Sequence, residues 1–165
     1  KALGQRPIIA EDLGFLTPSV QELLADTGYP GMKVLEFAFD SRDGGGRVYQ
    51  PHNYPTHCVA YVGTHDNDTA LGWLSTADPE DVALAREYLH LDPSEGENWG
   101  MMRAIWSSAA DCAIVQMQDL LDLGAEGRMN TPSTLGGNWQ WLARRLRRKM
   151  ELYERLPQGR KGEQV

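Results

Sequence analysis

Cysteine, long apolar runs and positive charge are all scarce in this sequence of 165 residues. The two cysteines, Cys58 and Cys112, form no Cys-x-x-Cys pair, which argues against a disulfide framework or a zinc knuckle and favours a reducing, cytoplasmic setting. The apolar stretches are far shorter than the roughly 18 residues that a membrane span needs. Residues 1–6 also lack the apolar core of a secretory signal. We therefore expect neither a disulfide-stapled secreted domain nor a membrane protein.

The charge balance narrows the choice of partners. Acidic residues outnumber basic ones by 23 to 16, and the formal net charge is -7. Nucleic acid and anionic membranes are then poor candidates, because proteins bind polyphosphate through neutralising cations. The one basic run, within residues 144–149, lies beside an apolar stripe that begins at Trp141, which is typical of the solvated face of a terminal helix. A neutral ligand such as a glycan is compatible with this composition.

Strand-like and helix-like segments alternate along the chain. Four short apolar runs have the length and composition of buried strands: residues 7–10, 33–39, 58–64 and 113–116. Three stretches between them carry helix caps or helical spacing: residues 18–28, 79–90 and 99–111. The long segment 40–56 is predicted to be a loop, and residues 158–165 a disordered tail. This alternation is typical of a parallel sheet, either small and open or part of a closed barrel.

A carboxylate follows two of the predicted strands. Glu11 comes directly after the run 7–10, and Asp66 closes the run that begins at Val59. Because an α/β barrel presents its catalytic side chains at the carboxyl ends of its strands, two acids at such positions predict a catalytic site. Paired carboxylates suit sugar chemistry, in which one acid donates a proton and another stabilises the positive charge of the transition state.

Several sequence blocks, in order, resemble one family. They are Ile-Ala-Glu-Asp-Leu-Gly at 9–14, Gly-Met-Lys-Val-Leu-Glu-Phe-Ala-Phe at 31–39, Gly-Thr-His-Asp-Asn-Asp-Thr at 63–69, Arg-Met-Asn-Thr-Pro at 128–132 and Asn-Trp-Gln-Trp at 138–141. Together they resemble the amylomaltases, which are the 4-alpha-glucanotransferases of the alpha-amylase superfamily. Ser133 and Leu142 depart from the family pattern.

The resemblance implies a fold and an activity. Residues 1–157 would be the carboxyl-terminal portion, about strands five to eight, of an α/β (β/α)8 TIM barrel. Such enzymes transfer segments of α-1,4-glucans (maltooligosaccharides, starch or glycogen) with retention, and the resemblance implies no cofactor. The family's nucleophile, an Asp, lies on the strand before the acid/base Glu, and this sequence begins after that point. We therefore expect the upstream half of the barrel as a partner, and no activity from this chain alone.

The same resemblance assigns roles to individual residues. Glu11 would be the general acid/base, and Asp66 would stay ionised and stabilise the transition state. His65 beside it would contact the sugar in the donor subsite, and Asn67 of the same block is assigned to substrate binding. Asp12 and Asp68 are expected to orient loops or cap helices.

Aromatic side chains divide into two groups. Sugar rings stack on aromatic faces, so Tyr54 and Trp73 are predicted substrate contacts, with Trp139 a weaker candidate. Trp99 and Trp106 have helical spacing and are predicted to lie in the core.

Two other functions remain open from the sequence. One is a metal-dependent hydrolase that uses Glu11, His65, Asp66 and Asp68 as ligands, which loss of activity with a chelator would support. The other is a non-catalytic glucan-binding module, for which maltodextrin binding that survives Glu11→Gln would be the sign.

Overall fold

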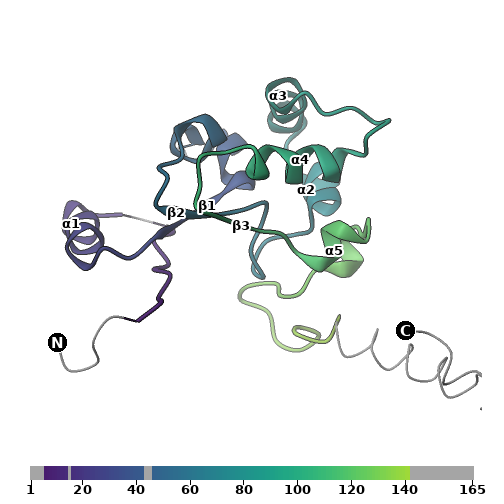
Figure 1. Ribbon diagram of the computed structural model, residues 1–165. Coiled ribbons are helices and arrows are strands. Elements are labelled where there is room, and N and C mark those ends of the chain that lie inside the picture. The colour runs from purple at the N-terminus through teal and green to yellow at the C-terminus, as the bar shows by residue number, and fades with distance from the viewer. Residues whose placement is uncertain (1–5, 15, 43–45, 142–165) are drawn as a thin grey trace, which may run out of the picture.

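In the part of the chain that the structure describes, three short parallel strands form the centre (Figure 1). The computed structural model describes residues 6–14, 16–42 and 46–141. The strands are β1 (Gly31–Val34), β2 (Cys58–Tyr61) and β3 (Cys112–Ile114), paired in the order β1-β2-β3. Because all three run in the same direction, their carboxyl ends meet at one edge of the sheet.

Helices connect and flank these strands. They are α1 (Pro18–Thr27), α2 (Ala70–Thr76), α3 (Pro79–Leu89), α4 (Glu97–Trp106) and α5 (Met117–Leu120), together with 3₁₀ turns at Leu35–Phe39, Gly46–Tyr49, Pro51–Asn53 and Ala125–Gly127. The predicted start of α3 is confirmed, since the Asp78 carboxylate accepts a hydrogen bond from the backbone N–H of Glu80 at 2.9 Å. The predicted stop of α1 is also confirmed, because Gly28 takes the left-handed conformation with φ of 66°.

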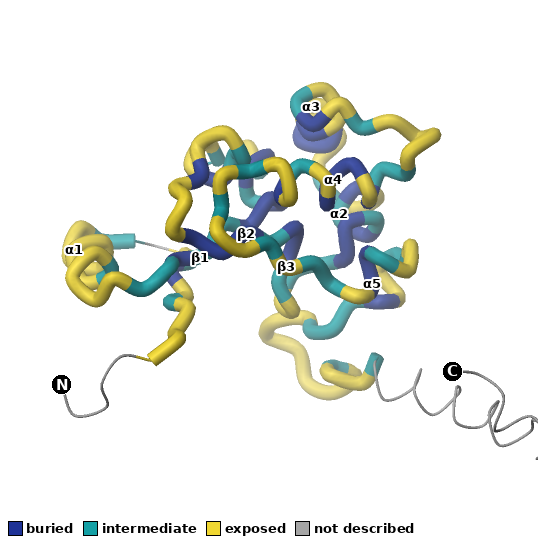
Figure 2. The backbone as a smooth tube through the Cα atoms, in the orientation of Figure 1, coloured by how far each residue is buried: buried dark blue, intermediate teal, exposed yellow. Residues whose placement is uncertain are grey.

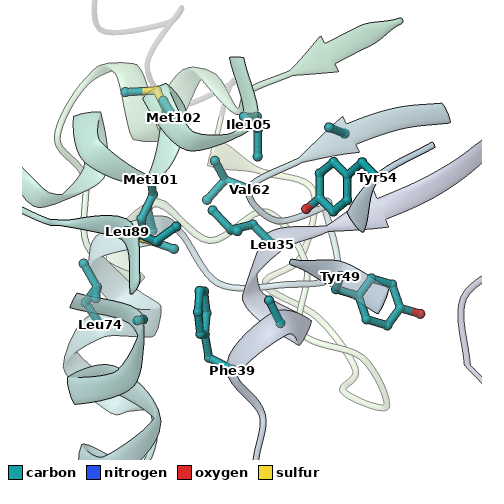
Figure 3. Packing of buried hydrophobic residues seen from close by; sticks show 14 of the residues in the cluster. Leu35, Phe39, Tyr49, Tyr54, Val62, Leu74, Leu89, Met101, Met102 and Ile105 are labelled. Carbon is teal, nitrogen blue, oxygen red and sulfur yellow. The ribbon is translucent and has the colours of Figure 1, made fainter. Parts of the chain in front are cut away.

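The core lies where the strand ends meet α2, α3 and α4. Figure 3 shows Leu35 and Phe39, from the turn after β1, pointing at side chains of these helices. Met101, Met102 and Ile105 of α4 are at most 1% exposed. By contrast, α1 has no buried residue, and Figure 2 shows it on the surface and apart from the other helices. The well-packed part of the molecule thus supports β2 and the loop that follows it.

The predicted strand at residues 7–10 is not formed. Ile8 and Ile9 are 43% and 46% exposed, and the segment is tied to the start of β1 by a backbone bond from Ala10 N to Pro30 O of 2.9 Å. A strand needs a ladder of such bonds, so the run is extended chain beside the sheet.

The predicted strand at 33–39 is also too long. The chain leaves the sheet after Val34 and turns into the 3₁₀ segment Leu35–Phe39, where Glu36 N donates to Val62 O at 3.1 Å. Both ends of this turn are buried, since Leu35 and Phe39 each belong to the core.

The other elements differ from prediction mainly at their ends. β2 and β3 are shorter than the runs 58–64 and 113–116, and α4 covers Glu97–Trp106 where 99–111 was predicted. The helices α2 and α5 were not predicted, because seven and four residues are too few to show a helical period. The loop predicted at 40–56 contains two short 3₁₀ turns.

Trp99 and Trp106 were assigned to the core, and this prediction is wrong. They are 39% and 48% exposed and pack against each other with ring centroids 6.1 Å apart. Helical spacing places them on one face of α4, but the face that points inward carries Met101, Met102 and Ile105. A common face therefore does not show which face is buried.

Two sequence predictions fall outside the described residues: the amphipathic helix continuing from Trp141 and the tail at 158–165. They remain predictions, as does the domain boundary between them. In the described ranges, no helix has the length and apolar character needed to cross a membrane.

Candidate active site

A cavity of about 830 Å³ opens at the carboxyl ends of the three strands. Its lining includes a residue or loop that follows each strand in turn: Phe37 after β1, residues 63–67 after β2 and Gln116 after β3. Glu11 lines the same cavity. The structure thus brings Glu11 and Asp66, which are 55 positions apart in the sequence, to one cavity at the carboxyl ends of the strands, although the segment before Glu11 is not itself a strand.

Glu11 is held by bonds made by its two neighbours. On one side Ala10 N donates to Pro30 O at 2.9 Å, and on the other the Asp12 carboxylate accepts from Met32 N at 2.6 Å. Asp12 is 9% exposed, whereas the Glu11 side chain is free to face the cavity. The orienting role expected for Asp12 is therefore confirmed.

Gly31 makes this attachment possible. A Cβ atom at Gly31 would lie 2.5 Å from the Asp12 Oδ2 atom, closer than real Cβ contacts come. The absence of a side chain at residue 31 lets Asp12 approach the backbone of β1 and hold Glu11 at the sheet edge.

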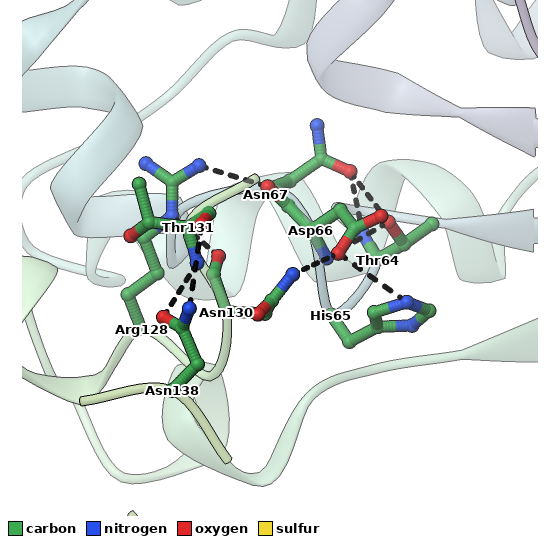
Figure 4. A network of polar contacts seen from close by, with 8 residues as sticks. All are labelled: Thr64, His65, Asp66, Asn67, Arg128, Asn130, Thr131 and Asn138. Carbon is green, nitrogen blue, oxygen red and sulfur yellow. Dashed lines mark hydrogen bonds and ion pairs between the residues drawn. The ribbon is translucent and has the colours of Figure 1, made fainter. Parts of the chain in front are cut away.

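Asp66 lies in a loop that is closed by its own side chains (Figure 4). The Asn67 Oδ1 atom accepts hydrogen bonds from both the backbone N–H and the hydroxyl of Thr64, at 2.9 and 2.8 Å. Asp66 N in turn donates to the Thr64 hydroxyl at 3.3 Å. These bonds fix a tight turn directly after β2, with Asp66 at its tip.

A second segment, distant in sequence, holds the same loop. The Asn130 side chain donates to the Asp66 carboxylate at 2.6 Å, and its backbone N–H donates to His65 O at 3.1 Å. The Arg128 guanidinium donates to Asp66 O at 2.8 Å. The block at 128–132 carries no predicted role, because nothing in the spacing of the sequence indicates that this segment returns to the loop after β2.

His65 and Trp139 form one wall of the cavity. Their rings are 4.9 Å apart, and His65 Nε2 lies 3.4 Å from the Asp66 carboxylate. Trp139 is 59% exposed and lines the cavity, so an aromatic face is available beside the two carboxylates. From the sequence alone, Trp139 is a weaker predicted sugar contact than Tyr54 and Trp73.

The other predicted substrate contacts, Tyr54, Trp73 and Asn67, differ in their positions. Tyr54 is 5% exposed and belongs to the core (Figure 3), and burial raises the pKa of its hydroxyl. Its position does not support the predicted sugar contact. Trp73 packs near Phe39 and lines a neighbouring cavity of about 570 Å³. Asn67 lines both cavities, although its carbonyl oxygen is used within the loop.

Two buried acids lie behind the loop. Burial, together with the negative charges of Asp119 and Asp68, holds the pKa of Glu36 well above its usual value. Burial raises the pKa of Asp119 to about 6, even though its carboxylate accepts a bond from Ala70 N at 2.8 Å at the start of α2. Nothing in the sequence indicates that either acid is buried, because each stands beside apolar residues as many loop acids do.

Metal binding finds no geometric support in this part of the chain. Across the described ranges, no three His, Cys, Asp or Glu side chains are grouped closely enough to hold a metal ion. Asp68 instead accepts a bond from Thr69 N at 2.8 Å, as expected for a residue that orients a loop.

Comparison with known proteins identifies the family. A family model described as 4-alpha-glucanotransferase matches residues 1–147. The chain belongs to the 4-alpha-glucanotransferase family. It is 50% identical over 143 residues to the 4-alpha-glucanotransferase of Clostridium butyricum and 46% identical over 148 residues to that of Thermus thermophilus. It is covered to 86% in each comparison but spans only 29% of the length of either relative.

A solved structure agrees with this family assignment. The amylomaltase of Streptococcus agalactiae, solved in complex with acarbose, matches with a TM-score of 0.78 and 43% identity, over 84% of this chain and 28% of that one. The resemblance drawn from the sequence blocks is confirmed, and so is the fold class, part of the α/β barrel of this family.

Proposed function

We propose that this protein is a retaining 4-alpha-glucanotransferase that moves segments of α-1,4-glucans between maltodextrins. The observation that carries the proposal is that Glu11 and Asp66 line one cavity at the carboxyl ends of parallel strands. Membership of the 4-alpha-glucanotransferase family supports the same reaction.

Glu11 is the general acid and base in this proposal. In the first step it gives its proton to the glycosidic oxygen while the bond from that oxygen to the anomeric carbon breaks. A second carboxylate bonds to the anomeric carbon as that oxygen leaves. In the second step Glu11 takes the proton of the acceptor hydroxyl, whose oxygen attacks the same carbon and displaces that carboxylate. The exposed position of Glu11 on the cavity wall allows both the leaving group and the acceptor to reach it.

Asp66 stabilises the positive charge that develops on the sugar ring. Its carboxylate is held by Asn130 at 2.6 Å and faced by His65 at 3.4 Å, so its orientation is fixed before substrate arrives. His65 and the exposed face of Trp139 are the proposed contacts to the donor sugar.

A retaining reaction also needs a carboxylate that attacks the anomeric carbon. We place it on a barrel strand upstream of Lys1, since the chain spans only 29% of the length of its relatives. The exposed apolar residues Ile8, Ile9 and Ile114, at the two sides of the sheet, would then pack against that upstream half. We further propose a cytoplasmic location, in keeping with the free thiols of Cys58 and Cys112.

The test is transfer between maltotriose molecules by the complete gene product, including any sequence upstream of Lys1. Separation of the products by chromatography should show glucose and longer maltooligosaccharides. Glu11→Gln and Asp66→Asn should each lower kcat by about 1000-fold, because each removes a group that acts in the transition state.

Matched controls are available on α1. Glu22→Gln and Asp26→Asn make the same chemical changes at exposed positions and should leave kcat unchanged. Near-normal turnover in Glu11→Gln or Asp66→Asn would refute the corresponding assignment. Maltodextrin binding by the wild type with no transfer at all would favour the glucan-binding module instead.

A further inference from the structure

The Arg128 side chain joins two segments of the site: the loop that carries Asp66 and the segment that contains Arg128 and Asn130 (Figure 4). Its Nη2 atom donates to Asp66 O at 2.8 Å, and its Nε atom donates to Asn130 O at 2.9 Å. Its Nη1 atom lies 3.8 Å from the Asp68 carboxylate. Each of the three guanidinium nitrogens therefore faces a different oxygen.

These contacts reach Asp66 from two sides. The bond from Arg128 holds the main chain of Asp66, while the bond to the Asn130 carbonyl helps to hold Asn130, whose own side chain binds the Asp66 carboxylate at 2.6 Å. Main chain and carboxylate are therefore both fixed through one guanidinium.

The charge of Arg128 is also placed among acids. Asp66 and Asp68 lie beside it, and its charge opposes the rise in the pKa of the buried Glu36. A lysine could supply the charge, but its single ammonium group cannot reproduce a planar fork that donates to two backbone carbonyls while it faces the Asp68 carboxylate.

We propose that Arg128 is a positioning residue that fixes the Asp66 carboxylate in the orientation needed for glucan transfer. The inference rests on the catalytic role proposed above for Asp66. Because a misplacement of about 1 Å in a catalytic group can cost roughly 100-fold in rate, the loss of the Arg128 contacts should lower kcat measurably.

The test is a double-mutant cycle with maltotriose in the complete gene product. Arg128→Lys should lower kcat by about 30-fold and change KM by less than about 2-fold, because the lost contact acts on the transition state. In the Asp66→Asn background the same change should lower kcat by less than about 3-fold, since the group that Arg128 positions is already disabled. The control Arg86→Lys, at an exposed ion pair with Glu97, should leave kcat unchanged in both backgrounds.

The outcomes separate this inference from the proposed function. An equal loss of kcat in both backgrounds, or no loss in either, would overturn the positioning role of Arg128. Normal turnover in Asp66→Asn alone would instead refute the assignment of Asp66. If circular dichroism shows that Arg128→Lys does not fold, Asn130→Ala replaces it in the cycle, because Asn130 links Arg128 to the Asp66 carboxylate. An equal loss of kcat in both backgrounds would again overturn the inference.

Discussion

The two proposed catalytic carboxylates are attached to the fold in different ways. Glu11 lies on an extended segment beside the sheet, and each of its two neighbours, Ala10 and Asp12, makes a bond to the start of β1. Asp66 lies at the tip of a loop that is bonded within itself and to a second segment around Arg128. A few bonds orient Glu11, the proposed acid/base, whereas a network orients Asp66, the proposed stabilising acid.

The chemistry proposed for each residue gives a reason for this difference. An acid that gives and takes a proton must serve a leaving group and an acceptor in turn, and an exposed, lightly attached side chain suits that exchange. A carboxylate that stabilises charge works best when it is already oriented, because reorienting it during the reaction would cost free energy. The comparison predicts that single changes near Glu11 are more harmful than single changes near Asp66.

The largest effect is expected at Asp12. Asp12→Ala leaves the N–H of Met32 without its partner, which should cost about 1.5–3 kcal/mol of stability and lower kcat by about 100-fold as Glu11 shifts. Asp12→Asn keeps the accepting oxygen and should lose far less on both counts. Thermal unfolding and maltotriose transfer measure the two effects, and a normal kcat in Asp12→Ala would show that Glu11 is oriented by other contacts.

A smaller effect is expected at Thr64. Thr64→Val keeps the shape but removes the hydroxyl that donates to Asn67 and accepts from Asp66 N, which should cost about 1–2 kcal/mol. Because the Arg128 and Asn130 contacts remain, kcat should fall only about 10-fold. Thr27→Val on α1, which also loses a hydroxyl bond, is the matched control. A loss larger than that of Asp12→Ala would reverse the comparison.

The smallest effect on turnover is expected at Glu36, which lies behind the Asp66 loop. In the unfolded chain a glutamate ionises near pH 4.3, whereas burial keeps Glu36 protonated to a higher pH in the folded state. Between these two pKa values the folded state binds a proton that the unfolded state has lost, so stability falls as pH rises. Glu36→Gln removes that loss, and its Tm should exceed that of the wild type at pH 8 and converge with it near pH 4.

This pH dependence has an internal control. Asp119, whose pKa burial raises to about 6, should still cause a fall in stability between about pH 4 and 6 in Glu36→Gln. Glu22→Gln, which makes the same chemical change at an exposed position on α1, is the matched control. A wild-type Tm that does not fall between pH 4 and 8 would contradict the protonated state of Glu36.

Much of the fold was predictable where the signal was local. The cap at Asp78 and the stop at Gly28 depend on neighbouring residues, and both were found in the sequence. The strand predicted at 7–10 is wrong. An apolar run shows that a segment can pair with another strand, but it does not show whether a neighbouring strand supplies the ladder of hydrogen bonds. The same limit applies to Trp99 and Trp106, since spacing defines a face and only packing decides whether it is covered.

The features of the candidate site also separate into those that the sequence predicts and those that depend on tertiary contacts. The sequence by itself determined the family and its chemical groups, because the blocks around Glu11 and Asp66 carry their residue types in a fixed order and end strand-like runs. Only the tertiary structure decided what surrounds them: that Arg128 returns to hold Asp66, that Trp139 lies at the cavity, and that Tyr54 lies in the core. These are contacts between segments far apart in the chain, and they depend on how elements pack rather than on local residue patterns.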